Sequence, residues 1–75
     1  MDAKIESIKV NNFTIRKGSY VSIDIWTDGS TIDVTVTDIY IKNGEISIES
    51  VTNLGSFITH SAEQWEDMLV KVHKY

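Results

Sequence analysis

The sequence predicts a small, mainly β fold with one helix at its C-terminal end. The strands are predicted by Asp28-Gly29 and Asn43-Gly44, which each stand between segments of alternating apolar and polar residues. Such dipeptides favour tight hairpins because both central positions of a type I′ turn require a positive φ. The helix is predicted by Ser61 and Gln64, a capping-box pair ahead of an apolar stripe. We expect a strongly bent antiparallel sheet, or a small SH3-like barrel, of about four or five strands plus this helix.

Two short strands are expected near the N-terminus. Their apolar residues are Ile5, Ile8 and Val10, followed by Phe13 and Ile15. Asn11-Asn12 between them favours a turn, and Lys17-Gly18 ends the second segment.

The hairpin at Asp28-Gly29 matches aliphatic residues across its two strands. A two-residue turn would pair Ile25 with Ile32, Ile23 with Val34, and Val21 with Val36. Because a slip of one residue would turn every side chain to the opposite face, this match favours the register.

The second hairpin also places matching side chains opposite each other. A turn at Asn43-Gly44 pairs Ile41 with Ile46, Ile39 with Ile48, and Lys42 with Glu45. In the strand before this turn, the apolar, inward-facing residues are even-numbered up to Val36 and odd-numbered from Ile39. The regular alternation of side chains between the two faces cannot change in this way without an extra residue. We therefore expect a β-bulge near Thr37-Asp38.

A loop over residues 52–55 and a short strand over residues 56–59 are expected before the helix. The helix is predicted over residues 62–73, with Asp67 and Lys71 as an ion pair one turn apart. Its apolar face consists of Ala62, Trp65, Met68, Leu69 and Val72. Such a face can lie across the sheet or in a dimer interface, so Trp65, Met68, Leu69 and Val72 are candidate dimer contacts.

Composition limits the possible functions. The chain has 75 residues, no cysteine and a net charge of −4. We expect one domain over residues 1–75. This length is near the lower limit for a chain that folds without disulfides or bound metal ions, so we also expect a homo-oligomer. The N-terminus shows no signal-peptide pattern and no run could span a membrane, so a cytoplasmic protein is expected. No cofactor or metal-binding motif is present.

Catalytic chemistry is not indicated. Without cysteine, a nucleophilic mechanism would need a Ser or Thr activated by His60 or His73. Both histidines have simple structural explanations beside or within the helix. We therefore expect a non-catalytic protein with no catalytic residue.

The outward face of the predicted sheet is acidic and carries aromatic residues. Its candidate binding residues are Tyr20, Asp24, Trp26, Asp33, Asp38, Tyr40 and Glu49. The expected registers place Asp24 opposite Asp33, and Asp38 opposite Glu49, and like charges directly opposite are destabilising. A basic protein partner would offset this repulsion, and so would a bound cation such as Ca²⁺, although no calcium-binding loop motif is present. The alternative is that the charges are only solvated.

Two segments resemble the positive cofactor four family of transcription coactivators. One is Ile15-Arg16-Lys17-Gly18-Ser19-Tyr20-Val21-Ser22-Ile23, and the other is Gly55-Ser56-Phe57-Ile58 followed by Ser61-Ala62-Glu63-Gln64-Trp65. The resemblance covers roughly residues 13 to 72. It implies a curved antiparallel sheet, a dimer, and binding of single-stranded DNA through Arg16, Lys17, Tyr20 and Trp26. The chain departs from the family by an additional strand at residues 45–50 and by acidic strand positions.

The leading functional hypothesis is a domain that binds a protein partner through the acidic, aromatic face. The alternative, implied by the resemblance, is a single-stranded nucleic-acid-binding protein.

Overall fold

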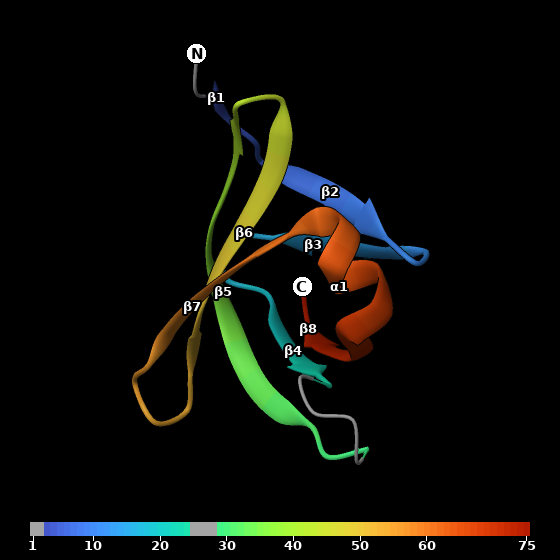
Figure 1. Ribbon diagram of the computed structural model, residues 1–75. Coiled ribbons are helices and arrows are strands. Elements are labelled where there is room, and N and C mark those ends of the chain that lie inside the picture. Colours follow the sequence, from blue (N-terminus) through green and yellow to red (C-terminus); the bar gives the residue numbers. More distant parts are fainter. Residues whose placement is uncertain (1–2, 25–28) are drawn as a thin grey trace.

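The computed structural model of the chain describes residues 3–24 and 29–75. Its strands are β1 (Ala3–Lys4), β2 (Ser7–Val10), β3 (Phe13–Arg16), β4 (Tyr20–Ile23), β5 (Ile32–Lys42), β6 (Glu45–Thr52), β7 (Phe57–Ser61) and β8 (Leu69–Lys74), and its helix is α1 (Ala62–Met68). The predicted class, mainly β with one helix near the C-terminus, is confirmed (Figure 1). No helix in the described ranges combines the length and apolar character needed to cross a membrane.

The strands form two antiparallel sheets. The larger has the order β7-β6-β5-β4-β8, and β1 pairs with the second half of β5, while β2 and β3 form a separate hairpin. β7 and β8 lie at opposite ends of this order, so the larger sheet is open. Of the two expected architectures, the bent open sheet is confirmed and the closed barrel is wrong.

Local turn chemistry explains two of the hairpins. Asn43 and Gly44 have φ values of 52° and 79°, and Asn11 and Asn12 have φ values of 50° and 72°. These are the left-handed conformations that a tight hairpin turn requires and that Asn and Gly tolerate best.

The register of the second hairpin is confirmed. Lys42 pairs with Glu45, Ile41 with Ile46, Ile39 with Ile48, and Asp38 with Glu49. The register then shifts between Val36 and Asp38, so the expected bulge is also confirmed.

The register predicted for the first hairpin is wrong by two residues. Val21 pairs with Val34 and Ile23 with Ile32, so that Ser22, and not Asp24, lies opposite Asp33. Val36 is instead held by the segment before β4, because its carbonyl accepts from the Gly18 amide and its amide donates to Ser19 O, each at 2.8 Å. An even slip keeps every side chain on its predicted face. The predicted Ile25–Ile32 pair and Asp28 of the turn lie outside the described residues.

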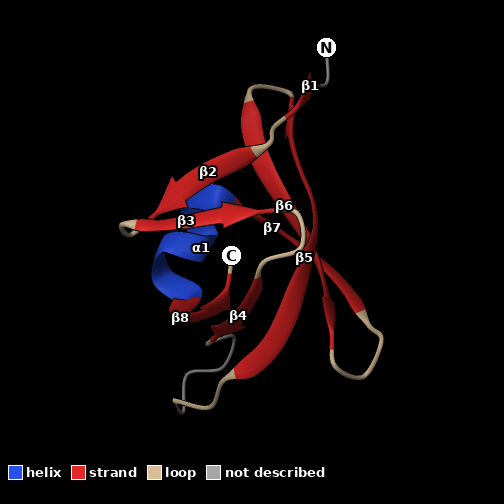
Figure 2. Cartoon of the chain, turned by 180° about the vertical axis from the view of Figure 1, so that it is seen from behind, coloured by secondary structure: helices blue, strands red, loops and turns tan. Residues whose placement is uncertain are grey.

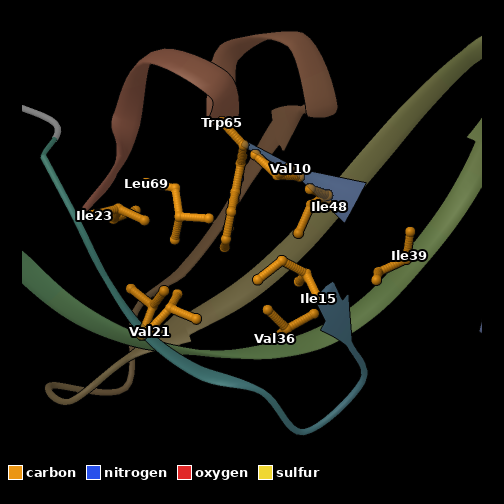
Figure 3. Close-up of a cluster of buried hydrophobic side chains, with 10 residues drawn as sticks. Val10, Ile15, Val21, Ile23, Val36, Ile39, Ile48, Trp65 and Leu69 are labelled. Carbon is orange, nitrogen blue, oxygen red and sulfur yellow. The ribbon is translucent and has the colours of Figure 1, made fainter. Parts of the chain in front are cut away.

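One face of the larger sheet is covered by α1 and the β2–β3 hairpin (Figures 1 and 2). Trp65 is fully buried, and Figure 3 shows its side chain between Leu69 on one side and Val10 and Ile48 on the other. The buried apolar residues are Val10, Ile15, Val21, Ile23, Val34, Val36, Ile39, Ile48, Trp65 and Leu69. We call the opposite face, away from α1, the outer face.

The start of the helix is confirmed and its end is wrong. Ser61 Oγ accepts from the Gln64 amide at 3.1 Å, and Gln64 Oε1 accepts from the Ser61 amide at 2.9 Å, which completes the capping box. The helix was predicted over residues 62–73, but it ends at Met68 and the chain continues as β8.

Pairing with β4 explains this early end. β4 is paired with β5 along one edge, and β8 supplies its neighbour along the other. Met68 O accepts from the Asp24 amide at 2.7 Å where the helix gives way to the strand. Val70 and Val72 are β-branched and suit a strand better than a helix. The predicted Asp67–Lys71 helical pair is therefore wrong, because Lys71 belongs to β8.

Candidate interaction surface

The outer face carries a row of directly paired residues that crosses all five strands of the main order. From β7 to β8 the row is Phe57, Val51, Thr35, Tyr20 and Lys74. Phe57 is 73% exposed, and Leu54 in the adjoining β6–β7 turn is 92% exposed. Large apolar side chains this exposed and this close together are typical of interaction sites.

Asp33 lies beside this row and is held by side chains from β4 and β8. Ser22 Oγ donates to Asp33 Oδ1 at 2.5 Å, and Tyr20 OH donates to Asp33 Oδ2 at 3.3 Å. Nε2 of His73 lies 2.6 Å from Ser22 Oγ and 3.6 Å from Asp33 Oδ1. The hydrogen bond from Ser22, with smaller contributions from His73 and Tyr20, holds the pKa of Asp33 below its usual value.

The Ser22, His73 and Asp33 cluster contains the residue types of a hydrolytic triad but not its geometry. In such a triad the carboxylate holds one imidazole nitrogen and the hydroxyl uses the other. Here Asp33 and Ser22 both face Nε2 of His73, and Ser22 is buried. The cluster ties β8 to β4 and β5, and it gives no support to a catalytic role.

A second acidic cluster lies where β1 joins β5. Asp38 and Glu49 face each other as predicted, and Lys4 pairs with Asp38 while its ammonium lies 5.7 Å from the centroid of the Tyr40 ring. The hydrogen bond from Lys4 lowers the pKa of Asp38, and the same contact raises the pKa of Lys4. The like-charge pair is therefore offset within the chain.

Tyr40 completes this second cluster. Burial, followed by a hydrogen bond to Glu49, raises the pKa of its phenol, so the ring stays neutral at physiological pH. A hollow of about 320 Å³ opens here, lined by Ala3, Lys4, Asp38, Tyr40, Lys42 and Glu49. Within the described ranges, no three His, Asp or Glu side chains gather closely enough to bind a metal ion.

The remaining predicted residues of the acidic face are placed as follows. Asp24 follows directly after β4 and is half-buried. It was predicted to lie opposite Asp33, but Ser22, two residues earlier, takes that position. Trp26 lies outside the described residues. The structure thus brings Tyr20 together with Asp33, and Asp38 together with Tyr40 and Glu49, as two clusters on one face.

Of the predicted nucleic-acid residues that the structure describes, Arg16 and Lys17 lie together and Tyr20 lies apart from them. Arg16 ends β3, and its guanidinium donates to the Tyr75 carbonyl at 3.3 Å. Lys17 lies close enough to Asp38 to help lower the pKa of that carboxyl. A hollow of about 420 Å³ contains both basic residues, together with Lys4, Ile5, Glu6 and Asp38. Tyr20 lies on β4 in a separate cluster, with its ring centroid 5.2 Å from that of His73.

The residues predicted as helix-mediated dimer contacts pack within the chain itself to different extents. Trp65 is completely buried and Leu69 is 8% exposed, so both belong to the core of the chain itself. Met68 and Val72 are partly buried and pack against the same core. A dimer through this helix therefore stays a prediction, and Trp65 and Leu69 are not available to it.

Sequence reasoning missed the residues of β8 and of the β6–β7 turn. Lys71 and Lys74 pair with Ser22 and Tyr20, which places two positive charges beside the outer face. The β-branched Val70 and Val72 were the available signal for this strand. The turn at Gly55 could have indicated that Leu54 is exposed. An inward-facing Ile58 could have indicated that its neighbour Phe57 faces outward.

No protein-family model, curated protein or solved structure matches the chain significantly.

Proposed function

We propose that the protein is a non-catalytic module that binds a protein partner through its outer face. The observation that carries the proposal is the exposed apolar pair Leu54 and Phe57 at the end of the cross-strand row that contains Tyr20. Neighbouring large apolar side chains exposed on a folded surface are typical of protein interaction sites.

Acidic groups flank this row of paired residues. Asp33 lies next to it on one side, and Asp38 and Glu49 lie farther along β5 and β6. Internal contacts hold these carboxylates in place, so a partner would meet a preorganised acidic rim. The partner expected for this surface is a protein with an apolar pocket bordered by Lys or Arg, and association should slow as salt rises.

The test is affinity capture with three immobilised proteins. The wild type should retain a partner from an extract of the cells that make it, and the double variant Leu54→Ser with Phe57→Ser should lose it. Val70→Ser is the matched control, because Val70 is 53% exposed but lies on β8 at the opposite edge. Far-UV circular dichroism must show that all three remain folded. Equal capture by the double variant would exclude this face.

A second candidate function is the binding of single-stranded nucleic acid, as the family resemblance implies. The observation that favours it is the pairing of Lys71 and Lys74 beside Ser22 and Tyr20, because basic and aromatic side chains together suit a single strand. The net charge of −4 opposes it.

Fluorescence anisotropy of a labelled single-stranded oligonucleotide separates the two candidates. Loss of two phosphate contacts in Lys71→Ala with Lys74→Ala should reduce the slope of log K against log salt by about 1.4. Lys9→Ala is the control, because Lys9 is exposed on the separate β2–β3 sheet. Absence of wild-type binding at low salt would exclude this candidate.

A further inference from the structure

β5 has different neighbours on the two sides of its bulge. Residues 32–35 pair with β4, whereas Tyr40 and Ile41 pair with β1 at the end of β5 that leads into the hairpin with β6 (Figure 1). β1 is only two residues long, and both residues are exposed. The chain therefore covers the second half of this β5 edge with a very short segment of its own.

Among the described residues, few contacts hold β1 in place. Ile5, which follows it, donates its amide to Ile39 O at 3.0 Å and is partly buried against the core. The other attachment is the ion pair between Lys4 and Asp38, in which the Lys4 side chain is 77% exposed. Exposed ion pairs contribute little to stability, and terminal segments with few buried contacts open locally. We expect β1 to leave the edge while the rest of the fold stays intact.

The surroundings of Lys4 indicate which kind of segment fits this edge. Lys4 stands opposite Tyr40, and its ammonium lies 5.7 Å from the centroid of that ring. The same ammonium pairs with Asp38, and Glu49, which lies directly opposite Asp38, accepts a hydrogen bond from the Tyr40 phenol. An aromatic face between carboxylates is an arrangement that binds Lys or Arg side chains.

The other basic groups nearby do not replace Lys4. Lys42 lines the same hollow but stands opposite Glu45 in the register. Lys17 contributes less than Lys4 to lowering the pKa of Asp38. If a neutral segment took the place of β1, Asp38 would lose its ion pair while it still faced a like charge on β6. A segment that replaces β1 must therefore bring its own cation.

We propose that the β5 edge over residues 39–42 is a peptide-binding site, which β1 occupies in the free chain and an extended segment of the partner protein occupies in the complex. The segment carries Arg or Lys at the position of Lys4. Backbone pairing supplies the affinity, and the hollow at Asp38, Tyr40 and Glu49 supplies the specificity, as in other cases of strand addition. The inference rests on the proposed function, because these three residues belong to the same outer face.

Arg is the preferred residue of such a segment. Its planar guanidinium presents five donors in a fixed fork and stacks on aromatic rings, so one Arg can reach both carboxylates while it covers the ring of Tyr40. The ammonium of Lys4 is a single point charge on a flexible stem. A partner segment with Arg therefore displaces β1 more readily than one with Lys.

Hydrogen exchange tests whether β1 opens by itself. The Ile5 amide, which donates to Ile39 O, should exchange at least about tenfold faster than the Val36 amide, after correction for intrinsic rates. Val36 is the matched control, because its amide donates to Ser19 O at 2.8 Å along the same strand. Equal protection of the two amides would mean that β1 is released only by global unfolding, and this result would overturn the proposal.

An NMR titration tests the recognition. The probe is the acetylated and amidated peptide Met-Asp-Ala-Arg-Ile-Glu, which is the sequence of residues 1–6 with Arg in place of Lys4. It is added to the full chain carrying Lys4→Glu, whose own β1 is weakened because a third carboxylate would meet Asp38 and Glu49. The peptide should shift the amide signals of Tyr40 and Ile41 towards their wild-type positions. Its Kd should be at least about tenfold lower for Lys4→Glu than for the wild type, in which β1 competes.

Two controls separate strand pairing from general charge attraction. Lys9→Glu makes the same change of charge on the separate β2–β3 sheet, so it should bind the peptide as weakly as the wild type does. The peptide with Glu in place of Arg should not bind Lys4→Glu. Lys4→Ala removes the ion pair without adding a carboxylate, and it takes the place of Lys4→Glu if that variant does not fold. Absence of binding to the weakened variant, or equal affinity for it and for the wild type, would overturn the proposal.

The titration contains no partner protein, so its outcome is independent of the capture experiment. Failure of the peptide to bind, with capture lost in Leu54→Ser with Phe57→Ser, would overturn the edge site and leave the proposed function standing. Peptide binding with unchanged capture by that double variant would support the edge site and exclude the apolar end of the outer face.

Discussion

Asp33 is the residue on which the outer face depends most directly. Hydrogen bonds from Ser22 and Tyr20, on β4, and the imidazole of His73, on β8, converge on its carboxylate. Each of these contacts favours the ionised form, which is why the pKa of Asp33 is lowered in the folded chain. The charge of Asp33 therefore stabilises the fold and also adds a negative group to the outer face.

Acid should weaken the fold through this group. A pKa that is lower in the folded than in the unfolded state stabilises the fold above the unfolded value of about 3.9, and this contribution disappears as pH falls through the folded value. The urea midpoint of the wild type should therefore fall between pH 7 and pH 3. Asp33→Asn should lower the midpoint at pH 7 and flatten its pH dependence.

Asp67→Asn is the matched control for this measurement. Asp67 is an exposed carboxylate on α1, away from the Asp33 contacts. Its replacement should leave the pH dependence close to that of the wild type. Equal flattening by both substitutions would show that the contacts of Asp33 contribute nothing particular.

Among the elements, β8 has the largest effect on the surface. It covers the second edge of β4, and it brings His73, Lys71 and Lys74 beside the outer face. Its inward residues, Leu69 and Val72, pack against the core that Trp65 fills. The strand thus connects the core to the candidate surface.

Two valines of β8 test this arrangement. Val72 pairs with Val21 and is partly buried, whereas Val70 is 53% exposed. Val72→Lys should lower the free energy of unfolding by about 1–3 kcal/mol, because a charge would enter the core without a partner. Val70→Lys should change it by less than about 0.5 kcal/mol. Chemical denaturation measures both, and similar losses would contradict the strand assignment.

At the scale of the whole molecule, one core joins the two sheets. Val10 and Ile15 come from the β2–β3 hairpin, while Val34 and Ile48 come from the larger sheet, and all are buried in the same cluster as Trp65. An isolated two-stranded hairpin is at best marginally stable in water. The smaller sheet therefore depends on the larger one.

This dependence predicts a single cooperative unfolding transition. Small domains with one core usually unfold without populated intermediates. In a urea titration, the amide NMR signals of Val10 and Val34 should disappear together with the far-UV circular dichroism. Earlier loss of the Val10 signal would show that the β2–β3 hairpin unfolds by itself.

The sequence by itself determined the features that depend on neighbouring residues. Asn43-Gly44 and Asn11-Asn12 select their turns through local φ requirements, and Ser61 with Gln64 selects the helix start through two local hydrogen bonds. The bulge before Asp38 was likewise visible in the alternation of β5. These features gave the fold class and most members of the acidic face.

Only the tertiary structure decided features that join distant segments. Leu69–Lys74 continues a helical pattern by sequence, yet it forms a strand because the open edge of β4 offers it hydrogen bonds. The two-residue shift of the first hairpin and the pairing of Lys4 with Asp38 likewise depend on how separate segments of the chain pair. Strand pairing depends on which edges remain open after the chain has folded, and that is a property of the whole molecule.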